Sequence, residues 1–542
     1  MTTVPDVSVV VAVYNTMPYL TECLNSLVAQ SIGLDRLEVV AVDDGSTDAS
    51  AAELDRFAER YPGTVKVIHQ ANSGGPAAPS NRALDVATGR FVYFVGSDDY
   101  LGEEALERMV AYADEHDSDV VIGKMVGTNG RYVHQKLYAK NDPDLDMFES
   151  SLPFTLANTK LFRRSLVEKH KLRFPEDLPV GSDQPFTIEA CVRARKISVL
   201  SDYTFYYAVK RGDASNITYR ADHLSRLRCT DAIMKHAASL VEPGPHRDAL
   251  FKRHFTWELA KLVQDDFPAL DAETRRELCA GIAALADAYL TDALRDSLDV
   301  KRRVRICLAR VGAVDELVRA ITEEAERGAP PFRLEGGRAF ALYPGFRDEA
   351  VGLPDRCYEL VGEAVPGRLA QGTELVSAEW EQAGDDLWLI LSVRIGVLGE
   401  TDSATVRLAQ GAMPKSADKP GARRLPKGYE LPPRAGECTV ETTSGGRATT
   451  LRGRIQVHTV KAKLGVRVYV DVAGSTYEIP VKVDGRPLPL ARRWGAVPYR
   501  VSVNRNPKGR LVMTTAPLWE TDSGLRERLR RKLSRLKRKI SR

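Results

Sequence analysis

Two neighbouring acids, Asp98 and Asp99, follow an apolar run at residues 91–95 of this chain of 542 residues. Such a run is typical of a buried parallel strand, and open α/β sheets bind ligands beyond the carboxyl ends of these strands. Carboxylate oxygens there suit a hard divalent cation that also bridges substrate phosphates. Ser97-Asp98-Asp99 is equally compatible with a plain turn or helix N-cap, so the stretch alone leaves both interpretations open.

A third acid, Asp183, immediately precedes a helical pattern at residues 186–193. An aspartate in this position commonly caps the helix. The same carboxylate would also serve as a general base, which takes a proton from a hydroxyl as that hydroxyl attacks. The local sequence favours the cap and leaves the base open.

The elements that must position these acids alternate in type over the first two hundred residues. Strand patterns alternating with short helices predict an α/β fold with a doubly wound, mostly parallel, Rossmann-like sheet. The expected strands are residues 7–13, 37–42, 65–69 and 91–95, and the expected helices are 19–29, 50–61, 83–87 and 103–117. A further strand is expected over residues 199–209.

Polar loops follow the first three expected strands. They begin at Tyr14, at Asp43-Asp44 and at Asn72, and the last contains Gly74 and Gly75. Aspartates can accept hydrogen bonds from a base or a ribose, and glycines let backbone approach a phosphate. Because the carboxyl ends of parallel strands meet at one edge, we expect a nucleotide crevice there, next to the acid pair.

The motifs together resemble family-2 glycosyltransferases with a GT-A fold. They are Val13-Tyr14-Asn15, the turn at residues 43–48, Asn72-x-Gly74 and Ser97-Asp98-Asp99, all within the first ~220 residues. The resemblance implies a nucleoside-diphosphate-sugar donor, usually uridine-linked, and a divalent metal, Mn²⁺ or Mg²⁺.

The resemblance also implies roles for single residues. Asp44 would contact the uracil, and Asp98 would be the main metal carboxylate with Asp99 beside it. Asp183 would be the base of an inverting transfer, because Ser182-Asp183-Gln184 matches the family's base position. The remaining predicted donor contacts are Val13, Tyr14, Asn72, Ser97 and Arg82. Gly96 stands where many relatives carry another metal-binding Asp, and Arg82 lies one position from the usual arginine.

Basic residues form two clusters downstream. Lys210, Arg211 and Ser215 lie in a loop that resembles the relatives' diphosphate loop, and Arg253 and His254 lie in a helical stretch. Charged side chains there would make strong hydrogen bonds to phosphate oxygens of the donor or of an anionic acceptor. Ordinary solvated charges remain the alternative for both clusters.

Composition narrows the class of protein. A formal net charge of +4 is too small to indicate nucleic-acid binding. The seven cysteines are widely spaced and form no metal-binding pattern, which favours reduced thiols. No apolar run approaches the roughly 20 residues that span a bilayer. We expect a cytoplasmic protein.

The rest of the chain predicts three further parts. Helical periodicity dominates residues 223–329, which we interpret as a linker, and short alternating runs then predict β-sandwich domains at about 330–430 and 431–518. Residues 525–542 contain ten Arg/Lys and one Glu around an apolar face, so residues 522–542 are expected to form a basic amphipathic helix. Such a helix favours an anionic membrane surface over self-association, because its like charges oppose pairing.

The order of GT-A domain (1–222), helical linker and β-rich half resembles the bacterial wall teichoic acid glycosyltransferases. That resemblance implies transfer of N-acetylglucosamine from a UDP-linked donor to poly(ribitol-phosphate), and a homo-oligomer, a trimer, assembled through the C-terminal half. A capsule, lipid or protein acceptor is the alternative within the same fold. A carbohydrate-binding scaffold without catalysis is the alternative outside the enzymes.

Overall fold

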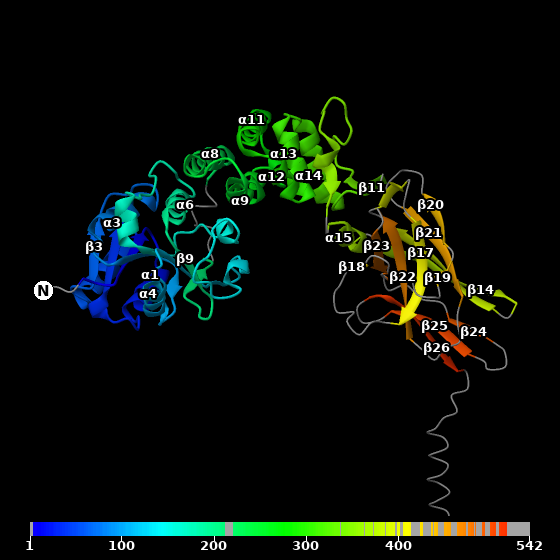
Figure 1. Ribbon diagram of the computed structural model, residues 1–542, viewed down its shortest axis with the longest axis horizontal. Coiled ribbons are helices and arrows are strands. Elements are labelled where there is room, and N and C mark those ends of the chain that lie inside the picture. Colours follow the sequence, from blue (N-terminus) through cyan, green and yellow to red (C-terminus); the bar gives the residue numbers. More distant parts are fainter. Residues whose placement is uncertain are drawn as a thin grey trace, which may run out of the picture. The chain divides into compact units, whose positions relative to one another are not determined.

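The chain folds into two compact units, described here from a computed structural model (Figure 1). The first unit comprises Met1–Leu298 and Ala309–Val314, and the second comprises Asp299–Leu308 and Asp315–Arg542. The structure describes residues 4–211, 221–335, 338–361, 364–371, 373–384, 386–395, 398–401, 405–412, 423–425, 435–436, 438–442, 449–456, 463–472, 475–481, 483, 490–493, 499–505 and 509–517.

A seven-stranded sheet forms the centre of the first unit. Its order is β3 (Val65–His69), β2 (Leu37–Asp43), β1 (Val7–Val13), β4 (Phe91–Gly96), β8 (Leu161–Arg163), β6 (Val120–Gly123) and β9 (Ile197–Leu200). Only β8 runs antiparallel to its neighbours. The mostly parallel GT-A-type sheet expected from the sequence is therefore confirmed.

The register of this sheet brings the predicted polar loops to one edge. Val13 pairs with Asp43, and Ala12 pairs with Gly96, so β1, β2 and β4 end side by side. The loops that follow these strands therefore start from neighbouring points, as a crevice at the carboxyl edge requires.

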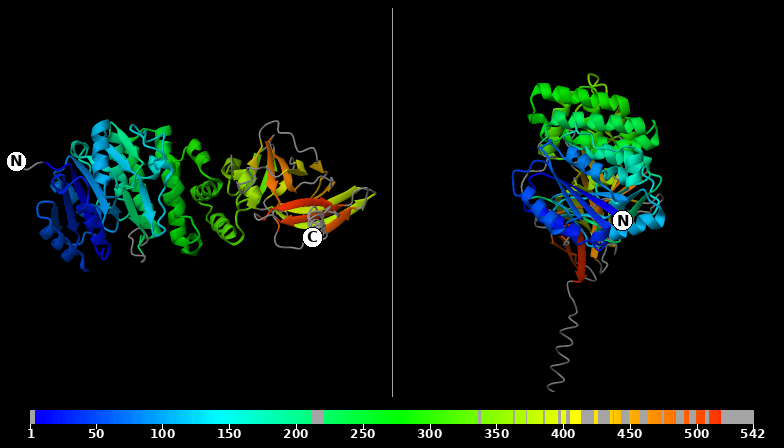
Figure 2. Two further views of the ribbon diagram at one scale, coloured as in Figure 1. Left: turned by 90° about the horizontal axis from the view of Figure 1, so that it is seen from below. Right: turned by 90° about the vertical axis from the view of Figure 1, so that its left-hand side faces the viewer.

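Helices cover both faces of the sheet (Figure 2). Alternate residues of β1, from Val7 to Val13, pack in a core with apolar side chains of α1, α2 and α4, whereas Val10 and Ala12 face a cavity lined in part by α3. The helices are α1 (Tyr19–Val28), α2 (Ser50–Arg60), α3 (Ala77–Val86), α4 (Ala105–His116), α5 (Arg164–Lys169) and α6 (Asp183–Arg193).

Two sequence predictions need correction. The helix expected over 83–87 begins at Ala77, so Arg82 lies on a helix and not on a loop. The strand expected over 199–209 is two strands in different sheets, β9 and β10 (Tyr206–Val209). The small second sheet has the order β5 (Tyr100–Leu101), β10 and β7 (Met125–Thr128), and β10 contacts the Asp99 carboxylate.

The predicted helical stretch is confirmed. It contains α8 (His223–Leu240), α9 (Pro245–Arg253), a π-helical turn (His254–Glu258), α10 (Leu259–Lys261), α11 (Ala272–Tyr289), α12 (Asp292–Ser297), α13 (Val300–Arg310) and α14 (Val314–Arg327). Asp222, Asp271 and Thr291 cap α8, α11 and α12 through their side chains, as these residue types commonly do. The first unit includes this stretch up to Leu298.

The C-terminal half is rich in strands, as expected. One four-stranded sheet has the order β13 (Glu359–Leu360), β12 (Arg338–Ala341), β11 (Phe332–Glu335) and β16 (Leu398–Thr401), and another has β14 (Thr373–Ala383), β15 (Asp386–Ile395), β21 (Thr449–Gln456) and β20 (Cys438–Thr442). The largest sheet contains β18 (Arg423–Arg424), β23 (Ser475–Pro480), β22 (Lys463–Val472), β26 (Leu511–Pro517), β25 (Tyr499–Arg505) and β24 (Leu490–Arg493), with β17 (Thr405–Ala412) on β22 and β19 (Ala435–Gly436) on β17. Helix α15 (Ala364–Gln371) lies between β13 and β14 in the chain.

Within the described residues, no helix combines the length and the apolar character needed to cross a membrane. The predicted basic helix at 522–542 lies outside the described residues.

Candidate active site

Asp99 is held tightly at the end of β4. Its side chain is buried, Tyr206 donates a hydrogen bond to Oδ2 (2.6 Å), and the Val209 amide donates one to Oδ1 (2.7 Å). Arg131 lies 3.3 Å from the same carboxylate. Burial, and next the neighbouring charge of Asp98, raise the pKa of Asp99 to about 6. The second sheet thus holds this carboxylate in place.

Asp98 is less buried than Asp99. Its Oδ2 accepts a hydrogen bond from Arg211 Nε at 2.7 Å, and the two side chains are 17% and 14% exposed. Arg211 also lies over the ring of Tyr19, 5.8 Å from its centroid. The sequence placed Asp98 and Arg211 in one site, and the structure brings them into direct contact.

The two carboxylates converge above Gly96. A Cβ atom at this position would lie 3.0 Å from Asp99 Oδ2 and 3.2 Å from Asp98 Oδ1. Tyr206 occupies the same corner, where its hydroxyl accepts a hydrogen bond from the Gly96 amide (3.0 Å). A larger side chain at position 96 would therefore meet an already crowded corner.

The acid pair fits a divalent cation of the oxygen-preferring kind. Two carboxylates that point to one place can hold Mg²⁺ or Mn²⁺ when a substrate diphosphate supplies further oxygens. Among the described residues, no group of three His, Cys, Asp or Glu side chains comes together as a metal site. Within the part of the chain that the structure describes, Asp98 and Asp99 are the carboxylates that would hold the cation.

Asp44 forms the second part of the site, at the end of β2. The Ser73 amide and hydroxyl and the Gln70 side chain all donate hydrogen bonds to its buried carboxylate. Asn72 donates to the Asp44 carbonyl (2.9 Å) and accepts from the Gly74 amide, so its side chain shapes the loop. A carboxylate has about four acceptor positions, so Asp44 retains capacity for one more donor.

The other predicted donor contacts lie around the same edge. Val13 and Ser97 are buried, Tyr14 is 45% exposed, and Arg82 is exposed on α3. Val13 acts through its backbone, because its carbonyl accepts a hydrogen bond from the Asp44 amide at 2.8 Å. These placements are compatible with the predicted contacts and do not test them.

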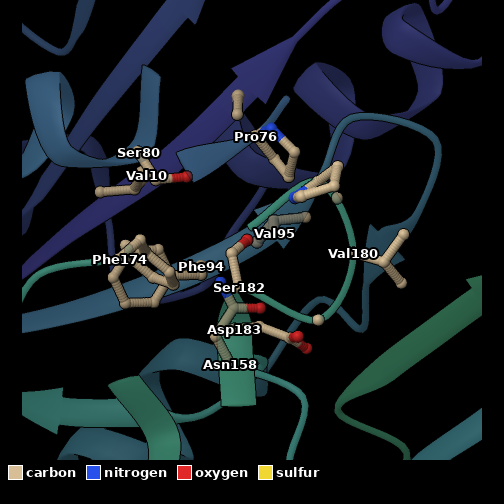
Figure 3. Close-up of a pocket in the computed structure, with 14 residues that line it drawn as sticks. Val10, Pro76, Ser80, Phe94, Val95, Asn158, Phe174, Val180, Ser182 and Asp183 are labelled. Atoms are coloured by element: carbon tan, nitrogen blue, oxygen red, sulfur yellow. The ribbon is translucent and has the colours of Figure 1, made fainter. Parts of the chain in front are cut away.

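Asp183 lines a cavity with residues from the end of β4. The cavity has a volume of about 270 Å³, and its lining includes Gly96, Val95 and Phe94 of β4 together with Ser182 and Asp183 (Figure 3). Ser182 holds the N-cap position of α6 and its side chain makes no capping hydrogen bond, while Asp183 is the first residue of the helix. The capping role that the local sequence favoured is therefore not the one that Asp183 has.

Burial raises the pKa of Asp183 above the ordinary aspartate value. Arg253 and, more weakly, Lys160 oppose this rise, while Glu258 adds to it. A base needs a pKa nearer the working pH than an exposed aspartate has, so the raised pKa suits proton transfer.

Sequence reasoning missed Lys160, Tyr206 and Ser73. Lys160 is buried and lies near the other charges, and burial lowers its pKa to about 8. No sequence signal marks Lys160 as buried, because only Leu161 and Phe162 are apolar among the surrounding residues 158–163. No sequence signal distinguishes Tyr206 from the tyrosines at 203 and 207.

The basic clusters divide into different environments. Lys210 is exposed, whereas Ser215 lies outside the described residues. Arg253 is bound to Glu258 and Gln184. His254 is fully buried, with its pKa lowered by burial to about 3, so an uncharged imidazole faces the protein interior and offers no charge to a phosphate.

Comparison with known proteins now adds to this geometry. Residues 8–171 match the family described as Glycosyl transferase family 2, and residues 228–321 match the Glycosyl transferase TarS linker domain. The crystal structure of S. aureus TarS residues 1–349 in complex with UDP-GlcNAc is 31% identical, and the match covers 66% of this chain and 99% of that one with a TM-score of 0.56. The chain belongs to glycosyl transferase family 2.

One further protein and one further solved structure are similar to this chain. The poly(ribitol-phosphate) beta-glucosyltransferase of Bacillus spizizenii is 42% identical over 214 residues, which are 39% of this chain and 34% of that protein. The chain thus matches about a third of that relative's length. The longer crystal structure of S. aureus TarS matches 96% of this chain and 86% of that one with a TM-score of 0.59, and at 24% identity it shows the fold alone.

Proposed function

We propose that this family-2 chain is an inverting, metal-dependent glycosyltransferase that moves a sugar from a UDP-linked donor to a hydroxyl of an anionic cell-envelope polymer. One observation carries the proposal: Asp183 lines the same cavity as Gly96, the residue above which the Asp98 and Asp99 carboxylates converge. The proposed proton acceptor and the acid pair proposed to hold the leaving diphosphate thus both adjoin Gly96.

Each site residue has a separate role in the proposed sugar transfer. Asp183 takes the proton of the acceptor hydroxyl as that hydroxyl attacks the anomeric carbon. Asp44 accepts a hydrogen bond from the uracil and orients the donor, and Arg211 and Lys210 contact the diphosphate. Asp98 and Asp99 would hold Mn²⁺ or Mg²⁺, which neutralises charge on the leaving diphosphate when bound. A single base with direct displacement converts an α-linked donor into a β-linked product.

The names of the relatives support the identity of the proposed donor and acceptor. TarS residues 1–349 were crystallised with UDP-GlcNAc, and the Bacillus spizizenii protein is named for glucosyl transfer to poly(ribitol-phosphate). We assign N-acetylglucosamine as the sugar and a polyol-phosphate polymer of the teichoic acid type as the acceptor. Assembly of a homo-oligomer through the C-terminal half and a peripheral position at the inner membrane face belong to the same proposal.

The experiment incubates the purified chain with UDP-GlcNAc or UDP-glucose and with poly(ribitol-phosphate). We expect UDP release and a new β-anomeric signal in the NMR spectrum of the polymer, faster with UDP-GlcNAc. Chelation of divalent metal with EDTA should slow transfer by about tenfold or more, and Mn²⁺ should restore it. An α-linked product would contradict inversion, and transfer only to a lipid, protein or uncharged glycan would contradict the acceptor.

A further inference from the structure

The segment before Asp183 has no regular structure of its own. Residues 173–181 form neither helix nor strand, although they lead directly to the N-cap of α6 and to Asp183. A segment of this kind keeps one conformation where side chains tie it to the rigid elements around it. The contacts that fix this segment therefore also fix the point at which the chain enters α6.

Asn81 of α3 ties this segment to the rest of the unit. Its side-chain amide donates a hydrogen bond to the Phe174 carbonyl (2.9 Å), and its Oδ1 accepts one from the Phe174 amide (2.9 Å). The side-chain amide also donates to the carboxylate of Glu176 (2.9 Å). Phe174 is 3% exposed, so without Asn81 both of its main-chain groups would lose a partner in a place with little water.

The ring of Phe174 packs in a cluster of three phenylalanines from three different elements. It is stacked on Phe186 of α6, with the ring centroids 4.4 Å apart and the planes at 4°. Its edge contact with Phe94 of β4 is 5.1 Å between centroids, and Phe94 and Phe186 are 5.4 Å apart. Aromatic rings in stacked and edge-to-face pairs favour defined relative positions, so this phenylalanine cluster fixes the three elements against one another.

The phenylalanine cluster lies beside both parts of the proposed chemistry. Phe186 follows Asp183 by three residues in α6, and Phe94 precedes Gly96 by two residues in β4. Phe94 and Phe174 also line the cavity together with Asp183 (Figure 3). A shift of Phe174 would therefore move both the start of α6 and a wall of the cavity.

We propose that Asn81 is a positioning residue for Asp183: by clamping the main chain of Phe174 to α3, it fixes the phenylalanine cluster and with it the start of the helix that carries the base. The proposal rests on the proposed function, in which Asp183 is the base. Helix α3 begins two residues after Gly75, so the clamp joins the helix beside the predicted donor loop to the helix of the base.

The first experiment compares the wild type, Asn81→Ala and Asn25→Ala. Loss of the clamp displaces the base relative to the bound sugar, so kcat for transfer should fall about ten- to hundredfold, because a misplacement of about 1 Å has an effect of that size. The Kd for UDP-GlcNAc, measured by calorimetry, should stay within about threefold of the wild type, because the loop at Asn72 is unchanged. Asn25→Ala, at an exposed asparagine of α1, is the matched control and should change neither quantity.

A merely structural role gives a different result. It reduces UDP-GlcNAc binding and transfer by the same factor, or leaves both unchanged, and either outcome would overturn the proposal. If Asn81→Ala does not fold, Asn81→Asp carries the same comparison, because it keeps an acceptor for the Phe174 amide and loses the donor to the Phe174 carbonyl.

A double variant checks that Asn81 acts through Phe174. Phe174→Leu removes the stacked ring and should lower kcat to a similar degree. The double variant Asn81→Ala/Phe174→Leu should be no more than about threefold slower than the slower single variant, because residues that act through one contact are not additive. Fully additive losses would show that the two residues act separately and would overturn the proposal.

A further experiment needs no transfer activity. Amide hydrogen exchange of residues 174–186, followed by mass spectrometry on the full chain without donor or acceptor, should be about tenfold faster in Asn81→Ala than in the wild type or Asn25→Ala. Unchanged exchange would overturn the proposal. Faster exchange together with no transfer by the wild type would leave the clamp supported and count against the proposed function.

Discussion

At the scale of single residues, the three acid sites differ in how many partners already hold them. Asp99 accepts hydrogen bonds at both oxygens, Asp44 accepts from Ser73 and Gln70, and Asp183 lines a cavity. The fixed carboxylates suit binding, and the one that faces open space suits proton transfer. The differences follow from which loops pack on each acid.

Replacing Asp44 with asparagine should weaken UDP binding about tenfold or more, since hydrogen bonds to a charged group contribute about 1.5–3 kcal/mol. The amide group of the new side chain would also oppose the donors of Ser73 and Gln70, which now meet a carboxylate. Calorimetric titration with UDP measures the loss. Asp35→Asn, at an exposed acid in a remote turn, is the control. Unchanged affinity of the Asp44 variant would remove this residue from the nucleotide site.

Residue types and spacing predicted the acids of the site better than their partners. Asp44, Asp98 and Asp183 follow strands or precede a helix in recognisable motifs, so their positions were readable. Tyr206 acts from a segment distant in sequence, and only the packing of β10 brings it to Asp99. Pairing across sequence separations of about a hundred residues leaves no local pattern.

At the scale of elements, the donor edge depends on contacts between β2, β3 and α2. His69 at the end of β3 lies 3.1 Å from Asp43 of β2 and 2.9 Å from Asp55 of α2. Hydrogen bonds to these two carboxylates raise the pKa of His69 above its ordinary value. The protonated ring therefore links three elements beside the turn that carries Asp44.

This link predicts a pH-dependent contribution to stability. A histidine whose folded-state pKa is raised stabilises fully below its unfolded-state pKa of about 6.5, and the contribution disappears as the pH rises through the folded-state value. His69→Gln should therefore lower the melting temperature of the first unit more at pH 5.5 than at pH 9. The difference should be small, about 1–3 °C, because the His69 side chain is half exposed and water screens the pair. A larger loss at pH 9 than at pH 5.5 would contradict this account.

Elements themselves were predicted well where they are long and periodic. The parallel strands β1, β2 and β4 and the helices of residues 223–327 lie where the apolar periods indicated. The short β8 was missed, because three residues of a strand carry too little pattern. Helix α3 begins earlier than expected. The sequence Pro76-Ala-Ala-Pro79 resembles a loop, but proline is tolerated in the first turn of a helix. The early start moves Arg82 onto the helix.

At the scale of the molecule, helices beyond residue 222, where we expect the transferase domain to end, pack against α6. His236 of α8 lies 3.3 Å from Glu189 of α6, and Arg253 binds Gln184 at the start of α6. The first compact unit accordingly continues to Leu298. Helix α6, which carries Asp183, is thus covered by helices that the sequence assigned to a separate linker.

Two truncations test this boundary. Residues 1–329 should stay folded and bind UDP-sugar within about threefold of the full chain, whereas residues 1–222 should lose binding or aggregate, because buried apolar side chains of α6 would face water. Calorimetry and size-exclusion chromatography measure the two outcomes. Full binding by residues 1–222 would show that the helical stretch has no part in the site.

The account's central claim is that Asp183 is the base, and a single-turnover measurement with Asp183→Asn tests it most directly. With donor saturating, transfer to the polymer should fall by about 10²–10⁴-fold while the Kd for the UDP-sugar stays within about threefold of the wild type. Asp177→Asn, an exposed acid in the loop before α6, is the matched control and should transfer at the wild-type rate. Transfer by Asp183→Asn at the wild-type rate would contradict the claim.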